Sequence, residues 1–149
     1  MLRLDERLLA DHERLERLFS DLLNAAEGAD QPTLQRVWTE FESGLLAHLD
    51  AEEQYLLPHF EKTDPDVAGT VRADHERIRK AIAGLGVSTD LHLLRLDVAE
   101  ELIRTLREHA ALETRSLYAW AERSVEEEDK AVILEALARE AKRRADASR

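Results

Sequence analysis

The sequence predicts an all-α protein, an up-and-down antiparallel four-helix bundle with an additional C-terminal helix. The composition is one reason: of 149 residues, 44% are hydrophobic and only 5% aromatic, with five glycines and three prolines, a profile typical of helical proteins. The second reason is that apolar residues recur at steps of three and four, which is the spacing of a buried helix face. The connections between these segments are short, and short connections make neighbouring helices antiparallel.

The first two predicted helices occupy roughly the first 61 residues. The first spans about residues 4–27, and the second begins near Pro32, a residue suited to a first helical turn. Pro58 lies inside the second helix and predicts a local kink there, because proline breaks the ladder of backbone hydrogen bonds. The apolar stripe of the first helix comprises Leu4, Leu8, Leu15, Leu18, Leu22 and Ala26.

The remaining segments predict three more helices. Asp64 is a good helix cap and Pro65 a good first residue, so the third helix begins there and ends at a glycine- and serine-containing loop, residues 84–89. The fourth helix is expected over about residues 90–123. Ser124, with Glu127 three positions later, forms a capping-box pattern that predicts the start of a last helix. Residues 1–123 are therefore interpreted as the bundle and residues 124–149 as an accessory helix packed on it.

Polar residues interrupt the apolar faces at regular positions. His48 and Glu52 continue the apolar series of the second helix, and His109 and Glu113 interrupt that of the fourth, again four residues apart. Residues four apart share one helix face. The first and third helices each carry one histidine in a repeated pattern, Asp11-His12-Glu13-Arg14-Leu15 and Asp74-His75-Glu76-Arg77-Ile78.

These polar residues are expected at one depth in the bundle. His12 and His48 both lie about 15 residues from the first turn, roughly 22 Å along the axis, and Glu52 and His75 both lie about 10 residues from the second turn. A lone histidine on an apolar face is more often a hydrogen-bonded core residue than a ligand. A buried carboxylate, however, needs a positive partner, and no Lys or Arg continues this stripe. The set of six therefore predicts a metal site.

Mixed imidazole and carboxylate ligands suit iron, manganese or zinc, and two carboxylates from opposite helices can bridge two ions. Disulfides, thiolate zinc sites and cysteine-ligated iron–sulfur clusters are excluded, because the chain has no cysteine. The predicted metal ligands are His12, His48, Glu52, His75, His109 and Glu113.

The ligand pattern over about residues 4–122 resembles that of the hemerythrin-like, HHE cation-binding family. It consists of one histidine, a His-x-x-x-Glu pair, a second single histidine and a second His-x-x-x-Glu pair, with Glu52-Glu53…Leu57-Pro58 after the second histidine. The resemblance implies an up-and-down four-helix bundle and a centre of two iron ions, with zinc or manganese as substitutes. It also implies that Glu52 and Glu113 bridge the ions and that the four histidines are terminal ligands.

The sequence departs from the oxygen-carrying hemerythrins in two places. They have His-x-x-x-His on the third helix, whereas Val71 stands one turn before His75 here, and His109-x-x-x-Glu113 replaces their His-x-x-x-x-Asp. One metal is thus short of an imidazole. His59 is a candidate for the missing ligand, and Tyr55 is expected near the same end of the site. The simpler interpretation of His59 is a histidine favourably placed near a helix C-terminus. Ferritin-like proteins are disfavoured because they need Glu-x-x-His pairs. His92 is interpreted as a surface residue.

The resulting prediction is a di-iron protein that binds or senses O2, NO or peroxide. The alternatives are a peroxide-decomposing enzyme, an iron storage or delivery protein, and a structural or interaction bundle with incidental metal. The net charge of −11 argues against a nucleic-acid partner, and no apolar run approaches the length of a membrane span. A cytoplasmic location is expected, and the last helix is a candidate surface for a homodimer.

Overall fold

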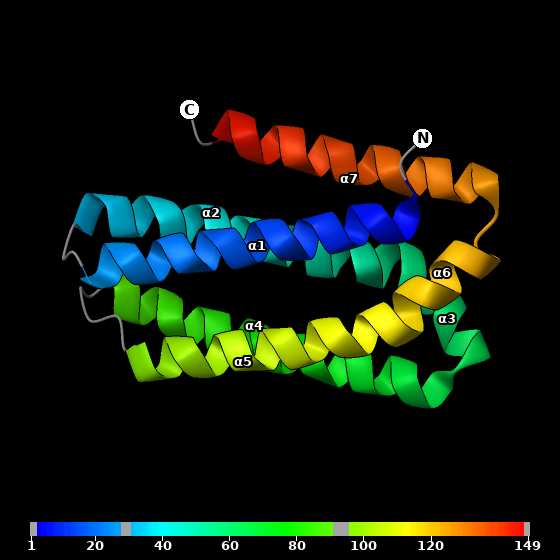
Figure 1. Ribbon diagram of the computed structural model, residues 1–149, viewed down its shortest axis with the longest axis horizontal. Coiled ribbons are helices and arrows are strands. Elements are labelled where there is room, and N and C mark those ends of the chain that lie inside the picture. Colours follow the sequence, from blue (N-terminus) through cyan, green and yellow to red (C-terminus); the bar gives the residue numbers. More distant parts are fainter. Residues whose placement is uncertain (1–2, 28–30, 91–95, 148–149) are drawn as a thin grey trace.

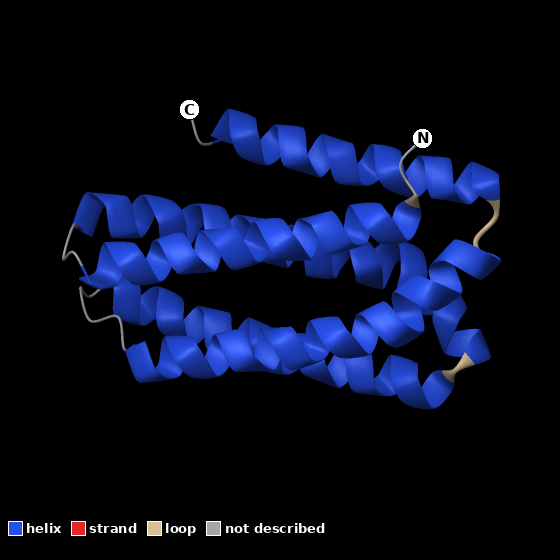
Figure 2. Cartoon of the chain, in the orientation of Figure 1, coloured by secondary structure: helices blue, strands red, loops and turns tan. Residues whose placement is uncertain are grey.

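The computed structural model describes residues 3–27, 31–90 and 96–147, and these form helices and no strands (Figure 2). The predicted all-α class is confirmed. In chain order the elements are α1 (Leu4–Glu27), α2 (Gln31–Ala51), the π-helical turn η1 (Glu52–Leu56), α3 (Leu57–Thr63), α4 (Pro65–Asp90), α5 (Leu96–Glu113), a second π-helical turn η2 (Thr114–Tyr118), α6 (Ala119–Ser124) and α7 (Glu127–Ala147).

The long helices lie alongside one another and alternate in direction (Figure 1). The α2 helix continues through η1 into α3, and α5 continues through η2 into α6, so each π-helical turn lies within a longer helical segment. The last helix, α7, packs against α1 and α2. Among the described residues, no helix combines the length and the apolar character needed to cross a membrane.

Two predicted helix starts are confirmed. The first helix has the predicted bounds, Leu4–Glu27, and α4 begins at Pro65, where the backbone N–H of Val67 donates to Asp64 Oδ1 over 3.1 Å. The irregularity expected near Pro58 is present, but it takes the form of η1, in which the N–H of Leu57 donates to the carbonyl of Glu52.

The loop predicted over residues 84–89 is wrong, because α4 continues through it to Asp90. Leu85 is buried in the core, and a Cβ atom added to Gly86 would lie only 3.3 Å from Glu42 Oε2 and 3.5 Å from the ring of Trp38. Gly86 therefore allows close packing of α4 on α2 and does not mark a turn. Asp90, the predicted start of the fourth helix, ends α4; α5 begins at Leu96.

The capping box predicted at Ser124 is also wrong. Ser124 is the last residue of α6, Val125 is extended, and α7 begins only at Glu127. The ammonium group of Lys130 donates to the carbonyl of Glu122 over 2.7 Å. A lysine from the following helix thus satisfies a carbonyl at the end of α6.

Two apolar clusters fill the interior. One is built around Phe19, Phe41 and Ile82, and the other around Leu8, Leu57 and Leu137. In α1 and α4, the residues of the two clusters occupy opposite ends, and His12 and His75 fall between them. In α2 with η1 and in α5 with η2, each His-x-x-x-Glu pair lies where the first cluster gives way to the second. The polar layer is therefore closed off by apolar side chains above and below.

Candidate metal centre

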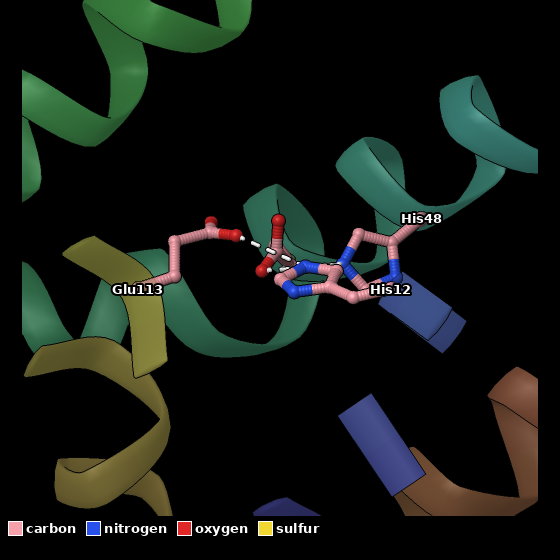
Figure 3. A group of neighbouring side chains, drawn as sticks. His12, His48 and Glu113 are labelled. Carbon is pink, nitrogen blue, oxygen red and sulfur yellow. Dashed lines mark hydrogen bonds and ion pairs between the residues drawn. The ribbon is translucent and has the colours of Figure 1, made fainter. Parts of the chain in front are cut away.

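The six residues predicted as metal ligands come together in two groups. His12, His48, Glu52 and Glu113 form the first group, and Glu52, His75, His109 and Glu113 form the second. Within each group, the ligand atoms lie within 4.8 Å of one another. His12 is half-buried, whereas the other five side chains are buried. In the first group, His12, His48 and Glu113 point toward one another from α1, α2 and α5 (Figure 3).

Glu52 and Glu113 belong to both groups and divide their oxygens between them. Glu52 Oε2 lies 3.5 Å from His48 Nε2, while its Oε1 lies 3.3 Å from His75 Nε2. Glu113 Oε1 lies 3.5 Å from His12 Nε2, while its Oε2 lies 3.4 Å from His75 Nε2 and 3.1 Å from His109 Nε2. Each carboxylate is thus positioned to bridge two cations.

A carboxylate outside the centre faces the second nitrogen of three of the histidines. Asp11 Oδ2 lies 3.4 Å from His48 Nδ1, and Asp74 Oδ2 lies 3.0 Å from His109 Nδ1. Glu53 Oε2 lies 3.3 Å from His75 Nδ1. Such partners orient an imidazole so that its other nitrogen faces the metal and make that nitrogen more basic.

An arginine in turn pairs with each of these three carboxylates. Arg7 Nε lies 3.7 Å from Asp11, Arg77 pairs with Asp74, and Arg79 Nη2 lies 2.7 Å from Glu53. The centre is therefore surrounded by histidines, then acids, then arginines at the edge of the bundle. Neither the acids nor the arginines were assigned to the site from the sequence. The signal for Asp11 and Asp74 was their place beside the histidines in the repeated pattern.

The charges in the centre alter the proton affinity of the histidines when no metal is bound. Burial opposes the charged form of His48, but Glu52, Asp11 and Glu113 outweigh it and raise the pKa to about 10. Burial is likewise outweighed at His75, where Glu113 and Glu52 raise the pKa to about 10. Conversely, despite burial, the histidines hold the pKa of Glu113 well below its usual range. Protons on the imidazoles therefore balance the buried carboxylates in the absence of a cation.

The hydroxyl group of Tyr118, a residue that no sequence pattern marks, lies close to all four ligand side chains of the first group. Its hydroxyl oxygen is 2.7 Å from His12 Nε2, 2.9 Å from His48 Nε2 and 2.7 Å from Glu52 Oε2. It is also 3.2 Å from Glu113 Oε1. Burial, together with the charges of Glu113 and Glu52, raises the pKa of the Tyr118 hydroxyl well above its ordinary value.

The candidate replacement ligands lie elsewhere. His59 is exposed, and it lines a separate pocket of about 420 Å³ with Tyr55, Trp120 and residues at the start of α7. His59 is in neither of the two groups. His92 lies outside the described residues.

The residues present fit a pair of cations. Glu52 Oε1 and His109 Nε2 are buried without a hydrogen-bond partner, although oppositely charged groups lie near both. A buried carboxylate oxygen and a buried imidazole nitrogen that lack hydrogen bonds are costly unless a cation meets them. Imidazole and carboxylate donors together are suited to iron, manganese and zinc.

A pocket of about 190 Å³ connects the centre with the surface between α1, α2 and α5. The ligand side chains in its wall are His12, His48, His109 and Glu113, and the remaining wall is largely apolar, including Leu15, Phe41, Leu45, Leu49, Ile103 and Leu106. Glu16, which is half-buried, and Arg107, which is exposed, also line it and form an ion pair between α1 and α5. Small molecules therefore have a path to both groups.

Comparison with known proteins gives one match. A family model described as the Hemerythrin HHE cation binding domain matches residues 3–121. No curated protein and no solved structure matches the chain.

Proposed function

Because the chain belongs to the hemerythrin HHE cation-binding family, we propose that it is a non-haem di-iron protein that binds or senses O2, NO or peroxide. Zinc and manganese are the expected substitutes for iron. The proposed metal ligands are His12, His48, Glu52, His75, His109 and Glu113. The single observation that carries this proposal is that both buried glutamates offer one oxygen to each group of histidines.

The proposed architecture is the up-and-down four-helix bundle of this family. Its four members are α1, α2 with α3, α4, and α5 with α6, and α7 is the accessory helix. The alternation of helix directions supports this arrangement (Figure 1). The order of the two apolar clusters along the chain also supports this arrangement. Successive antiparallel helices must pass through the two clusters in opposite order.

The pocket supports a small ligand. At about 190 Å³ it is smaller than the roughly 300–1,000 Å³ typical of sites for drug-sized molecules. Its apolar wall favours small neutral molecules and limits the entry of water. When bound, iron would supply exchangeable coordination positions for such a ligand. The protein itself holds the metal, orients the imidazoles through Asp11, Asp74 and Glu53, and shields the centre.

The test is metal analysis and optical spectroscopy of protein produced in iron-sufficient medium. We expect two irons per chain and charge-transfer absorption that changes when azide or peroxide is added to the oxidised protein or NO to the reduced protein. His75→Ala removes a proposed ligand and should lower the iron content toward one per chain. His59→Ala is the matched control, and it should leave both content and spectrum unchanged because the side chain is exposed.

Folded protein that binds no metal would contradict the proposal and favour an interaction bundle. Bound iron whose spectrum does not respond to azide, peroxide or NO would reject the proposed ligand binding and would favour iron storage or delivery as the function. Catalytic release of oxygen from peroxide by the iron-loaded protein would identify an enzyme at the same centre.

A further inference from the structure

The environment of the Tyr118 hydroxyl does not match that of a simple hydrogen-bonding group. Its four neighbours are two imidazole nitrogens and two carboxylate oxygens at 2.7–3.2 Å. A neutral hydroxyl has one proton to donate and two lone pairs. Ionised Glu52 and Glu113 can only accept, so both compete for that one proton, and the hydroxyl can donate to only one of them at a time.

The same spacing is the one expected around a metal ion. Donor atoms about 2.1 Å from a metal lie about 3 Å from one another when their bonds are at right angles. His12 Nε2 and His48 Nε2 are 3.1 Å apart, and the Tyr118 oxygen is 2.7 and 2.9 Å from them. Two facing imidazole nitrogens, two carboxylate oxygens and one phenol oxygen therefore form a donor set of five around one position.

The second group of histidines has no such neighbour. Tyr118 is five residues after Glu113, across η2, and Leu57 is five residues after Glu52, across η1. The two positions correspond in the internal repeat, and both side chains are buried, with exposures of 1% and 0%. A leucine offers no donor, so among the histidines and acidic residues that the structure describes, the site of His75 and His109 has the two shared carboxylates and these two imidazoles.

We infer that Tyr118 binds the metal ion held by His12 and His48 as a phenolate, and that the small ligand binds at the metal held by His75 and His109. This inference rests on the proposed function. On metal binding, the phenol O–H bond breaks, an oxygen–metal bond forms, and the proton leaves to solvent water through the pocket that His12 and Glu113 line. No electron is transferred in this step. His109 also lines that pocket, whereas His75 does not, so the second metal would be approached from the side of His109.

The chain contains a matched control, because it has only two tyrosines. Tyr55 is half-buried in the separate pocket beside His59. Tyr118→Phe removes only the hydroxyl and keeps the ring in the core, whereas Tyr55→Phe makes the same chemical change away from the centre. The full-length chain and both variants are loaded with iron, oxidised, and compared by visible absorption, resonance Raman spectroscopy and metal analysis.

We expect the wild type and Tyr55→Phe to show a visible phenolate-to-iron(III) absorption band. Raman excitation into this band should enhance tyrosinate ring vibrations, and Tyr118→Phe should lack both the band and these vibrations. We also expect Tyr118→Phe to bind one of its two metals at least 10-fold more weakly, while azide still perturbs the remaining absorption. Titration of metal-free protein with Zn²⁺ should give a tyrosinate ultraviolet difference spectrum in the wild type and Tyr55→Phe only.

Two irons per chain without tyrosinate vibrations in the wild type would overturn this inference and leave the proposed function intact. This outcome is decided on the wild type alone, so it does not depend on folding of Tyr118→Phe. A tyrosinate signal that is lost in Tyr118→Phe together with all azide response would retain the phenolate ligand but overturn the assignment of the open position. Absence of bound metal in every form would reject the proposed function itself.

Discussion

At the scale of single residues, each aspartate of the repeated Asp-His pattern acts on a neighbouring helix. Asp11 precedes His12 in α1 but faces His48 in α2, and Asp74 precedes His75 in α4 but faces His109 in α5. One short pattern therefore supplies an imidazole that faces the centre and an aspartate that orients the imidazole of the neighbouring helix. Because both aspartates are buried, loss of their charge should weaken metal binding by the imidazoles that they orient.

The first prediction concerns Asp74→Asn, which keeps the size of the side chain but removes its charge. We expect a 10- to 100-fold lower metal affinity, because the partners of metal-bound imidazoles commonly contribute that much. Competition with a chromophoric chelator measures it. The control is Glu76→Gln, an exposed change in α4, and equal affinities for the two variants would contradict the role of Asp74.

The second prediction is a loss of stability of the metal-free protein at alkaline pH. The folded pKa values of His48 and His75, about 10, exceed the ordinary value of 6.5. Their contribution is therefore fully present below about pH 6.5 and is lost as pH rises toward 10. The urea midpoint should fall across this window. His75→Gln should show a shallower fall, and a midpoint that rises or stays constant in the wild type would contradict the assignment of these protons.

The six proposed ligands could be predicted because their types and spacing interrupt apolar faces, and local spacing is visible in a sequence. Tyr118 could not, because tyrosine is an ordinary core residue and five-residue spacing places it off the face of a regular α-helix. The orienting role of Asp11 and Asp74 depends on which helices are neighbours. That information lies in the packing and not in any one segment.

At the scale of elements, the second π-helical turn, η2, explains the position of Tyr118. A π-helical turn pairs residues five apart, so the fifth residue after Glu113 returns to the face of the ligands. Helix starts with a strong cap, such as Asp64-Pro65, were predictable because the signal is local. The continuation of α4 past Gly86 was not, because it depends on contact with Trp38 of α2.

The third prediction concerns α7, which packs on α1 and α2 and contributes no residue to either metal group. Deleting residues 126–149 removes Ile133 and Leu137 from the cluster that contains Leu4 and Leu8. The expected loss of stability is roughly 3–6 kcal/mol, taken as two buried aliphatic side chains. Metal content per chain should be unchanged. Thermal melting and metal analysis test both parts, and loss of metal would show that α7 supports the centre.

At the scale of the whole molecule, the polar layer between two apolar clusters makes metal binding and folding stability interdependent. Carboxylates and imidazoles buried there favour the folded state only when protons or cations balance them. Metal that binds the folded chain and not the unfolded chain stabilises it by mass action.

The fourth prediction is that metal raises the melting temperature. A concentration 100-fold above the dissociation constant gives about 2.7 kcal/mol for one site, or roughly 5–10 °C for a chain of this size. Differential scanning calorimetry of metal-free protein with and without Zn²⁺ measures the shift, and a chelator should reverse it. Mg²⁺ at the same concentration is the control, since it prefers oxygen ligands, and an equal shift with Mg²⁺ would contradict imidazole ligation.

Each metal group takes its residues from three helices. The first draws on α1, on α2 with η1, and on α5, and the second draws on α2 with η1, on α4 and on α5. Glu113 is needed by both and lies near the end of the matched family region, residues 3–121. During synthesis on the ribosome, neither group is complete until this glutamate has been added and α5 has joined its neighbours. Metal can therefore be held by a complete ligand set only after most of the bundle has been synthesised.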